Sequence, residues 1–289
     1  MKYAYFNSCS MPTTGKEYDS TLRAVFDILK IDIVDLKTWI CCGSTMAHHS
    51  SRLLSLSLPL KNLSEVEKAG LNAIIAPCSA CYAQFKAAQH EIEENPEIKK
   101  KVEHIIEYQF KGKVEVYHPL EVLARDDVIS RMPGLVKRNL SGFKIACYYG
   151  CLLVRPPKVT RFKDECEYPM SMDNILKACG FKTIDWSYKT DCCGGSLSIT
   201  KPEIIKKLSK LIFDDAKAAG ADAIANPCIF CQMNLDSRQQ EIEKSYGTSY
   251  RLPVLYFSQL VALALGVPFK KLMFQKHFLN PGVLLKNQG

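Results

Sequence analysis

Two kinds of segment alternate along this chain. Short runs such as 72–76 (NAIIA) and 222–226 (DAIAN) are continuously apolar, as strands buried on both faces are. Between such runs lie longer segments with a helical pattern of apolar and polar positions. Strands that alternate with helices predict βαβ units and a parallel sheet.

The same series of segments occurs twice. Each series has a strand that ends in a cysteine, a helix and second strand, a Cys-Cys-Gly, an apolar strand running into Cys-x-x-Cys, and a last strand that enters a helix. The matching segments are 1–9 with 143–151, 21–36 with 172–186, 41–43 with 192–194, 67–81 with 217–231, and 113–124 with 251–264. Cys42 and Cys78 are 36 positions apart, and Cys193 and Cys228 are 35 apart. Such agreement predicts a duplicated domain.

We therefore predict an α/β fold with two tandem, duplicated Rossmann-like domains, whose small parallel sheets are related by pseudo-two-fold symmetry. The expected domains span residues 1–140 and 141–289, because Pro, Gly, Asn and Ser cluster at 132–142. Segment 152–173 has two consecutive prolines and no period, which predicts a loop that covers the site. The basic, irregular tail beyond 267 is expected to pack or to contact a partner.

Length, composition and net charge disfavour several classes of function. A length of 289 residues favours two domains, and 47% hydrophobic residues is enough for real cores. No window reaches 18 apolar residues, and the start lacks the layout of a signal peptide, so we expect a cytoplasmic protein with no membrane span. The net charge of +8 is dispersed, which disfavours nucleic-acid binding and leaves an anionic substrate or acidic partner as a milder interpretation.

The thirteen cysteines carry the candidate chemistry, since a reducing compartment favours metal ligands or redox thiols over disulfides. In each half one cysteine follows the first strand, a pair follows the second strand, and the Cys-x-x-Cys ends the third strand and opens a helix. All three positions lie at the carboxyl edge of a parallel sheet, where such folds bind ligands. The converging sets are Cys9, Cys41, Cys42, Cys78 and Cys81, and Cys151, Cys192, Cys193, Cys228 and Cys231.

Five thiols suit some cofactors better than others. Zinc takes four ligands, so one cysteine in each half would be surplus. Adjacent cysteines chelate one ion awkwardly but suit two neighbouring metal atoms, and a disulfide between them would be strained. Cubane iron–sulfur clusters use four cysteines. The pattern favours a larger, unusual iron–sulfur assembly, with a zinc module and a plain Cys-x-x-Cys thiol–disulfide oxidoreductase as alternatives.

The doubled motif resembles the paired CCG domains of the B subunit of heterodisulfide reductase, over residues 1 to about 266. The resemblance implies two noncubane 4Fe–4S clusters that cleave a disulfide, the first on Cys9, Cys41, Cys42, Cys78 and Cys81 and the second on Cys151, Cys192, Cys193, Cys228 and Cys231. It also implies two partners, a ferredoxin-like C subunit and a flavin-carrying A subunit. In methanogens the family acts on the coenzyme M–coenzyme B heterodisulfide, and relatives act on other disulfides or serve fumarate reductases and hydroxy-acid oxidation systems. An electron-relay role is therefore the main alternative.

A disulfide takes two electrons, whereas a cluster normally passes one. Two clusters facing each other could each supply one electron and each capture one sulfur, which would explain the duplication. We expect the substrate disulfide, from a small molecule or a protein, to lie between them.

Other residues receive narrower predictions. Aligning FNSC with YYGC assigns Cys151 to the site and Cys147 to the core; Cys179 is expected to be buried and Cys166 to be a free thiol. Further candidates are Gly43 and Gly194 for close approach of the backbone to the clusters, His118 for a site role at the carboxyl edge, Arg155 for an anionic substrate group, and His48 or His49 for a proton or hydrogen bond near the first cluster.

Overall fold

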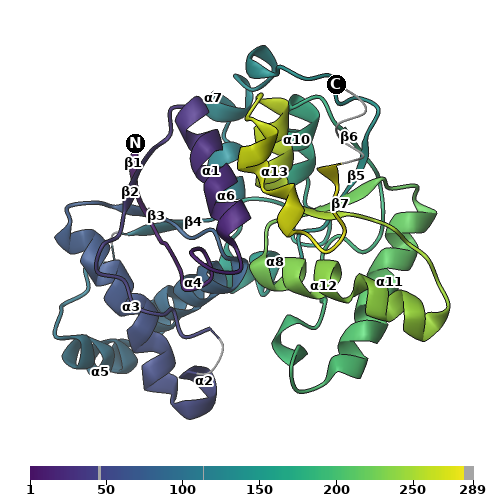
Figure 1. The fold of residues 1–289 in the computed structure, drawn as a ribbon. Coiled ribbons are helices and arrows are strands. Elements are labelled where there is room, and N and C mark those ends of the chain that lie inside the picture. Colours follow the sequence, from purple (N-terminus) through teal and green to yellow (C-terminus); the bar gives the residue numbers. More distant parts are fainter. Residues whose placement is uncertain (45–46, 113, 283–289) are drawn as a thin grey trace.

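The computed structural model describes residues 1–44, 47–112 and 114–282. The first half contains a four-stranded sheet and the helices that flank it (Figure 1). Its elements are β1 Lys2–Tyr5, α1 Lys16–Ile28, β2 Asp32–Asp35, α2 Ala47–Ser50, α3 Arg52–Lys68, β3 Ala73–Ile75, α4 Ser79–Glu94, α5 Pro96–Ile106, β4 Glu115–Tyr117, α6 Pro119–Leu123, α7 Asp126–Ile129 and the 3-10 helix Pro133–Leu135. Residue 113, at the predicted start of the last strand, lies outside the described residues.

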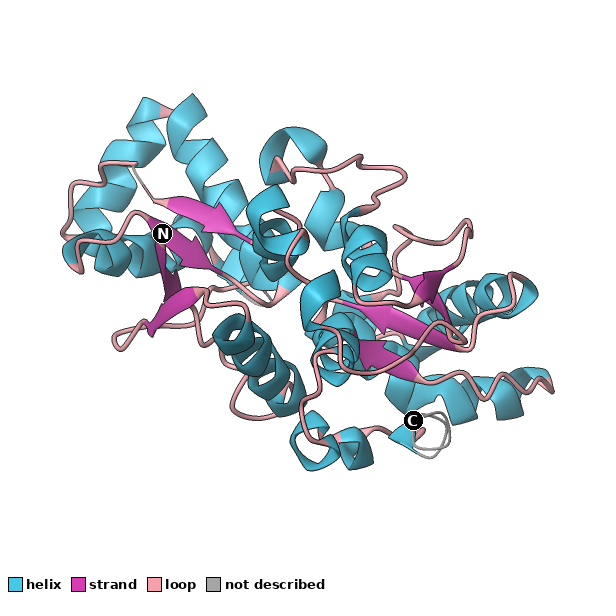
Figure 2. Ribbon diagram, turned by 90° about the horizontal axis from the view of Figure 1, so that it is seen from above, coloured by secondary structure: helices cyan, strands magenta, loops and turns pink. Residues whose placement is uncertain are grey.

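The second half repeats this plan. Its elements are β5 Lys144–Cys147, α8 Cys151–Val154, α9 Pro157–Thr160, α10 Ser171–Ala178, β6 Lys182–Thr183, the 3-10 helix Gly195–Leu197, α11 Pro202–Ala218, β7 Ala223–Asn226, α12 Ile229–Tyr246, β8 Val254–Tyr256, α13 Phe257–Ala264, α14 Phe269–Leu272 and the 3-10 helix Phe274–Lys276. The strand orders are β2-β1-β3-β4 and β6-β5-β7-β8, and every pairing is parallel. The predicted duplicated α/β fold is confirmed, and Figure 2 shows the two sheets as separate groups of strands.

The shared strand order follows from the sequence pattern. All residues of β3 and β7 are buried, as their continuous apolar runs predict. In each sheet the second strand lies on one side of the first strand and the third strand lies on the other side. The switch point is therefore between β1 and β3 in the first half and between β5 and β7 in the second. Ligands of open α/β sheets bind beside such a point, at the carboxyl ends of the strands.

The two halves pack through α1 and α6 of the first against α13 and α10 of the second, and Figure 1 shows α1 lying beside α13. One apolar core runs through both halves and contains, for example, Tyr5 and Ile74 from the first half and Leu263 from the second. A second core lies in the second half, where Phe213 of α11 and Leu235 of α12 are buried. The halves are therefore joined by buried surface, although the predicted boundary at residue 140 stays a prediction.

Segment 152–173 corrects one expectation. The sequence predicts a loop here, and residues 161–170 form neither helix nor strand, but the segment also continues α8 from Cys151, forms α9, and enters α10 at Ser171. Consecutive prolines do not prevent this, because proline is well placed in the first turn of a helix. The segment packs on α4 of the first half, where the Tyr82 hydroxyl donates to the carbonyl of Thr160 at 3.0 Å.

The tail beyond 267 also contains short helices rather than being irregular throughout. Leu272, Phe274 and His277 are buried, in keeping with the packing role expected of this segment. Residues 283–289 lie outside the described residues. No described helix has both the length and the apolar character needed to cross a bilayer.

Candidate metal centres

Three segments of the first half bring five cysteines to the carboxyl edge of its sheet. Cys9 follows β1, Cys41 and Cys42 follow β2, Cys78 is the N-cap of α4, and Cys81 lies in the first turn of that helix. The sulfur atoms of Cys42 and Cys81 are 3.0 Å apart. Cys41 lies against Cys9, and Cys78 lies against Cys81, so the predicted set converges.

The second half gathers its predicted set in the same way. The sulfurs of Cys193 and Cys231 are 3.5 Å apart, Cys151 lies against Cys192, and Cys228 lies against Cys231. In both halves the second cysteine of the pair and the Cys-x-x-Cys are buried, while Cys41 and Cys192 are exposed. Each set therefore has a buried side within the fold and an open side toward solvent.

Metal ligation favours thiolates, and the local contacts supply them. The hydrogen-bond contact with Cys81 lowers the pKa of Cys42 to about 6, and the contact with Cys151 lowers the pKa of Cys192 to about 6. The pKa values of the two partners, Cys81 and Cys151, are raised by the same contacts. Each half thus holds at least one thiol that ionises near neutral pH, which is the form that binds soft metals.

The glycines of the Cys-Cys-Gly motifs have a clear backbone role. Gly43 has a φ of +78° and Gly194 a φ of +79°, a region that residues with a side chain rarely adopt. In this conformation the Gly43 N–H donates to the Cys41 sulfur at 3.4 Å, and the Gly194 N–H donates to the Cys192 sulfur at 3.3 Å. Close approach of these glycines to a cofactor stays a prediction.

Gly150 is a further glycine at the site, and sequence reasoning missed it. Its φ is +70°, and a Cβ at this position would lie 3.2 Å from the sulfur of Cys231. Its place directly before Cys151 was a usable signal. The corresponding residue of the first half is Ser8, which is buried with a φ of +22°.

The Cys-x-x-Cys turns of the two halves meet. The Ser79 hydroxyl, next to Cys78, donates to the carbonyl of Pro227 at 3.3 Å, and it also contributes to lowering the pKa of Cys228. Cys231 is the larger cause of that shift, which brings the pKa of Cys228 to about 7. A side chain of one half therefore contacts a candidate ligand of the other.

His118 caps α6, as its position at the carboxyl edge predicted, and is fully buried. Its Nδ1 accepts from the Leu120 N–H at 3.2 Å, so its Nε2 carries the hydrogen and donates to the Pro77 carbonyl at 3.0 Å. Burial lowers the pKa of His118 to about 3. A neutral imidazole thus anchors the turn that precedes Cys78.

Arg155 is engaged within the chain. Its guanidinium donates to the Thr190 carbonyl at 3.2 Å and to the Thr190 hydroxyl at 3.1 Å, and it pairs with Glu167. These contacts hold the loop before Cys192. Binding of a substrate anion by Arg155 stays a prediction, and such binding would require exchange of at least one of these partners.

A buried ion pair that the sequence motifs did not predict supports the loop before Cys192. The Lys189 ammonium lies 3.1 Å from the Asp173 carboxylate, and both side chains are almost fully buried. The Lys189 carbonyl accepts from the N–H groups of Tyr149 and Gly150, at 2.7 and 3.1 Å. The pair therefore ties together the segments that carry Cys151 and Cys192.

The remaining predicted residues lie apart from the two sets. Cys147 is buried in β5, Cys179 is buried at the end of α10, and Cys166 is partly exposed near the carboxylates of Glu165 and Glu167. All thirteen cysteines are free thiols. The rings of His48 and His49 are 4.0 Å apart on the exposed surface of α2.

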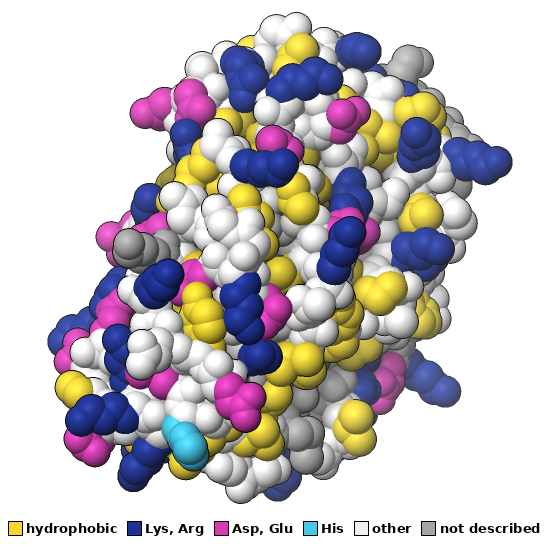
Figure 3. All heavy atoms as spheres, turned by 90° about the vertical axis from the view of Figure 1, so that its left-hand side faces the viewer, with side chains coloured by type: hydrophobic (Ala, Val, Ile, Leu, Met, Phe, Trp, Pro, Cys, Tyr) yellow, Lys and Arg dark blue, Asp and Glu magenta, His cyan; other side chains and the backbone are white. Residues whose placement is uncertain are grey.

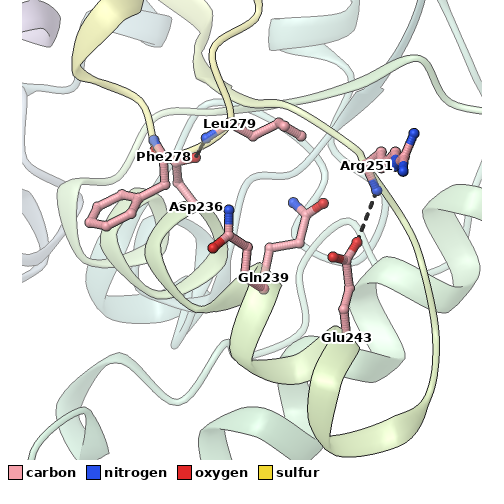
Figure 4. Close-up of a pocket in the computed structure, with 7 residues that line it drawn as sticks. Asp236, Gln239, Glu243, Arg251, Phe278 and Leu279 are labelled. Carbon is pink, nitrogen blue, oxygen red and sulfur yellow. Dashed lines mark hydrogen bonds between the residues drawn. The ribbon is translucent and has the colours of Figure 1, made fainter.

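The chain also has a surface cavity of about 380 Å³ on α12, away from the cysteines (Figure 4). Asp236 and Glu243 line it, but their carboxylates accept from the backbone N–H groups of Phe278 and Arg251, at 3.1 and 3.0 Å. Figure 3 shows another face, on which basic and acidic side chains are interspersed rather than gathered by sign. The two cysteine sets are therefore better candidates for the functional site than this cavity or this surface.

The donor sets can be tested against the cofactors that five thiols suit. Among the described residues, no three His, Cys, Asp or Glu side chains surround one point as a single metal ion requires. The sulfurs of each half lie instead in close contact with one another at the sheet edge, and each Cys-x-x-Cys stands at the start of a helix, α4 or α12, whose positive end favours anionic ligands. All-sulfur donors distributed in this way fit iron–sulfur chemistry.

Fold and site together define a doubled α/β protein with one five-thiol centre in each half. The model of the CCG cysteine-rich domain matches residues 3–86 and 145–236, so this chain belongs to the CCG cysteine-rich domain family. The match spans both cysteine sets and confirms the duplication.

Relatives extend over nearly the whole chain. The 8-methylmenaquinol:fumarate reductase membrane anchor subunit of Wolinella succinogenes is 30% identical, with 94% of each chain covered. The B subunit of a ferredoxin/F420H2-dependent CoB-CoM heterodisulfide reductase of Methanosarcina acetivorans is 30% identical, covering 92% of this chain and 89% of the relative. The resemblance to the B subunit of heterodisulfide reductase is thereby confirmed. A solved structure of a hypothetical protein from Helicobacter pylori has a TM-score of 0.75 at 15% identity, covers 96% of this chain and 52% of that chain, and supports the fold alone.

Proposed function

We propose that this chain is the catalytic iron–sulfur subunit of a heterodisulfide reductase-type complex, which reductively cleaves a disulfide between two noncubane 4Fe–4S clusters. The observation that carries the proposal is the convergence of five cysteines in each half at sheet edges whose Cys-x-x-Cys turns touch through Ser79 and Pro227. The relatives named as B subunits of heterodisulfide reductases support it.

The chain's own residues would hold one cluster in each half. The ligands of the first would be Cys9, Cys41, Cys42, Cys78 and Cys81, and those of the second Cys151, Cys192, Cys193, Cys228 and Cys231. When bound, each cluster would supply one electron and an iron atom that binds one sulfur of the substrate. The buried thiols would fix the cluster against the fold, and the exposed Cys41 and Cys192 would lie on its open side.

The remaining parts of the proposal follow from the family. Electrons would arrive from a ferredoxin-like C subunit and a flavin-carrying A subunit. The substrate would be the coenzyme M–coenzyme B heterodisulfide or an analogous small-molecule or protein disulfide. A cytoplasmic location stays a prediction.

Anaerobic purification followed by iron and sulfide counting tests the cofactor. We expect about eight iron atoms per chain, four for each cluster. Disulfide-dependent oxidation of a reduced viologen dye then tests the reaction, with the coenzyme M–coenzyme B heterodisulfide as first substrate. A protein that carries two zinc ions, or no metal, would overturn the proposal.

A second candidate is an electron-relay role in another oxidoreductase. The 30% identity to a fumarate reductase subunit of Wolinella succinogenes favours it. A relay would hold the same clusters, but no disulfide would perturb their spectra or reoxidise the dye. The spectral titration with disulfides therefore separates the two candidates.

A further inference from the structure

Two tyrosines are stacked where the halves join. Tyr18 comes from α1 of the first half, and Tyr256 ends β8 of the second. Their ring centroids are 4.5 Å apart with an interplanar angle of 7°, and both side chains are fully buried. The helices around them are fixed by a 2.7 Å hydrogen bond between the hydroxyls of Thr21 and Ser258. The phenol pair is therefore held rigidly in the junction.

Neither phenol has a hydrogen-bond partner among the described residues. Burying a hydroxyl without a partner is costly, and native proteins generally avoid it. Other buried tyrosines of the chain do have acceptors for their hydroxyls: Asp19 for Tyr5, Thr160 for Tyr82, Asp191 for Tyr148 and Asp173 for Tyr149. The two unpaired hydroxyls thus point to an acceptor that is bound at this junction in the working protein.

The sulfurs of Cys78 and Cys228 lie near enough to affect both hydroxyls. Burial raises the pKa of Tyr18, and the nearby Cys228 and Cys78 raise it further. Burial and Glu17 raise the pKa of Tyr256, and the same two cysteines contribute. Both phenols therefore stay protonated and act as donors, in the field of the first cysteine of each Cys-x-x-Cys.

Contacts between the halves bring the start of α1, which carries Tyr18, close to both Cys-x-x-Cys turns. Ser79 links the Cys78 turn to Pro227, and a Cβ on Gly15 would lie 2.9 Å from the side chain of Ile229, the residue after Cys228. The loop between Cys9 and α1 is thus pressed against the start of α12. Tyr18 lies in the first turn of α1, which begins directly after Gly15, so this contact places it beside the start of α12.

We propose that Tyr18 and Tyr256 are positioning residues whose hydroxyls donate hydrogen bonds to the ligand sulfurs of Cys78 and Cys228 in the cluster-loaded protein. This inference rests on the cluster ligation in the proposed function. Hydrogen bonds to cluster sulfurs raise the reduction potential, because they stabilise the negative charge that reduction adds. A single pair of donors between the halves would tune both centres together.

The test uses the full chain with Tyr18→Phe, Tyr256→Phe and the double substitution. These changes delete only the hydroxyls and keep the stacked rings. Tyr250→Phe is the matched control, because Tyr250 is also buried but its hydroxyl donates to Asp214 at 2.6 Å, in the second core away from the junction. Iron content, redox titration followed by EPR, and unfolding of the cluster-free protein are measured for each.

We expect full iron content, lower reduction potentials and roughly 10-fold faster loss of iron to a chelator in the Tyr18 and Tyr256 variants, as for other outer-sphere changes. Without clusters these variants should resist unfolding at least as well as the wild type. Tyr250→Phe should show unchanged potentials and lower resistance to unfolding. Unchanged potentials in an iron-replete double variant would overturn the inference.

The outcomes separate this inference from the proposed function. A wild-type protein that binds no iron defeats the proposed function and this inference together. Clusters whose potentials shift in the variants, in a protein that reduces no disulfide, support the tyrosine role and contradict the disulfide reaction. Turnover that falls with unchanged potentials contradicts the tyrosine role alone.

Discussion

The two halves hold the same cysteine pattern on the same strand order, but they support the Cys-x-x-Cys turn with different residues. In the first half the neutral His118 donates to the Pro77 carbonyl. In the second half the corresponding cap is Tyr256, and the turn is anchored by Asn226, whose side-chain oxygen accepts from the Cys228 N–H at 3.1 Å. Topology therefore fixes where ligands converge, while the supporting residues can diverge.

In the second half, His277 of the C-terminal segment also contributes to the support of the Cys-x-x-Cys turn. The Asn226 amide donates to the Gln232 side chain at 2.7 Å, and Gln232 in turn donates to Nδ1 of His277 at 3.1 Å. The first half has Ala76 and Tyr82 at the positions of Asn226 and Gln232. The second centre is thus tied to the C-terminal segment, whereas the first is tied to α6 of its own half.

The sulfur environments differ as well. The Asn234 amide lies 3.7 Å from the Cys193 sulfur and donates to the Cys193 carbonyl at 3.3 Å. The first half has Gln84 at this position, which donates instead to the Ser55 carbonyl at 2.7 Å. Ser79 acts on Cys228, but its counterpart Ile229 has no hydroxyl to act on Cys78. The first centre has a donor of its own in Ser44, whose hydroxyl and N–H contribute to lowering the pKa of Cys42. The two centres therefore differ in which residues surround their sulfurs.

The largest expected effect comes from removing one ligand in either half. Cys42→Ser and Cys193→Ser should each abolish disulfide reduction rather than halve it, because the proposed reaction needs one electron from each cluster. Iron content should fall by about half in each variant, four atoms of eight. Cys147→Ser is the matched control and should retain full iron, since Cys147 lies in the core. Half-activity in either ligand variant would contradict the paired arrangement of the halves.

Asn226→Ala tests the anchor that only the second half has. The change leaves the Cys228 N–H and the side-chain oxygen of Gln232 without these buried partners, so we expect about 3 kcal/mol of destabilisation. Denaturant unfolding of the cluster-free chain measures it. The mirror change Ala76→Asn gives the first half the second half's residue. If the loss in Asn226→Ala is below about 0.5 kcal/mol, the anchor is not structural.

His118 gives the first half a pH dependence. Its folded pKa of about 3 lies below the unfolded value, so the unfolded chain binds the extra proton. The stability from neutral His118 is complete above about pH 6.5 and falls as the pH decreases, by roughly 2 kcal/mol at about pH 5. His118→Asn keeps a capping residue and should flatten this slope. Urea unfolding of the wild type and of His118→Asn over this pH range measures the slope. An unchanged slope in the variant would show that His118 is not the group responsible.

The sequence predicted the parts of this molecule that repeat. The duplicated motif placed all ten cysteines at the two sheet edges, and the FNSC and YYGC alignment separated Cys151 from Cys147. The positions follow because a parallel sheet brings the ends of its strands to one edge whatever the intervening residues are, while the ligand role of each thiol stays a prediction. The short helices in 152–173 were missed, because four-residue helices have too few positions to show a period.

The residues that hold the cysteine-bearing segments in place could not be predicted from the repeat. Tyr18 and Tyr256 are far apart in sequence and meet only because the halves pack, and His277 reaches Gln232 from a tail without a motif. Lys189 and Asp173 pair inside the core, where neither residue type is expected. Asn226 was the exception, since an amide in an otherwise apolar strand was visible in the sequence.

The smallest expected effect concerns Asn234. Asn234→Ala removes an amide beside the Cys193 sulfur, so the potential of the second cluster should decrease while that of the first stays unchanged. Gln84→Ala is the matched control, because its amide serves the Ser55 carbonyl and should leave both potentials unchanged. Redox titration with EPR detection resolves the two clusters. A shift in the first cluster's potential, or equal shifts in both variants, would contradict the difference drawn between the halves.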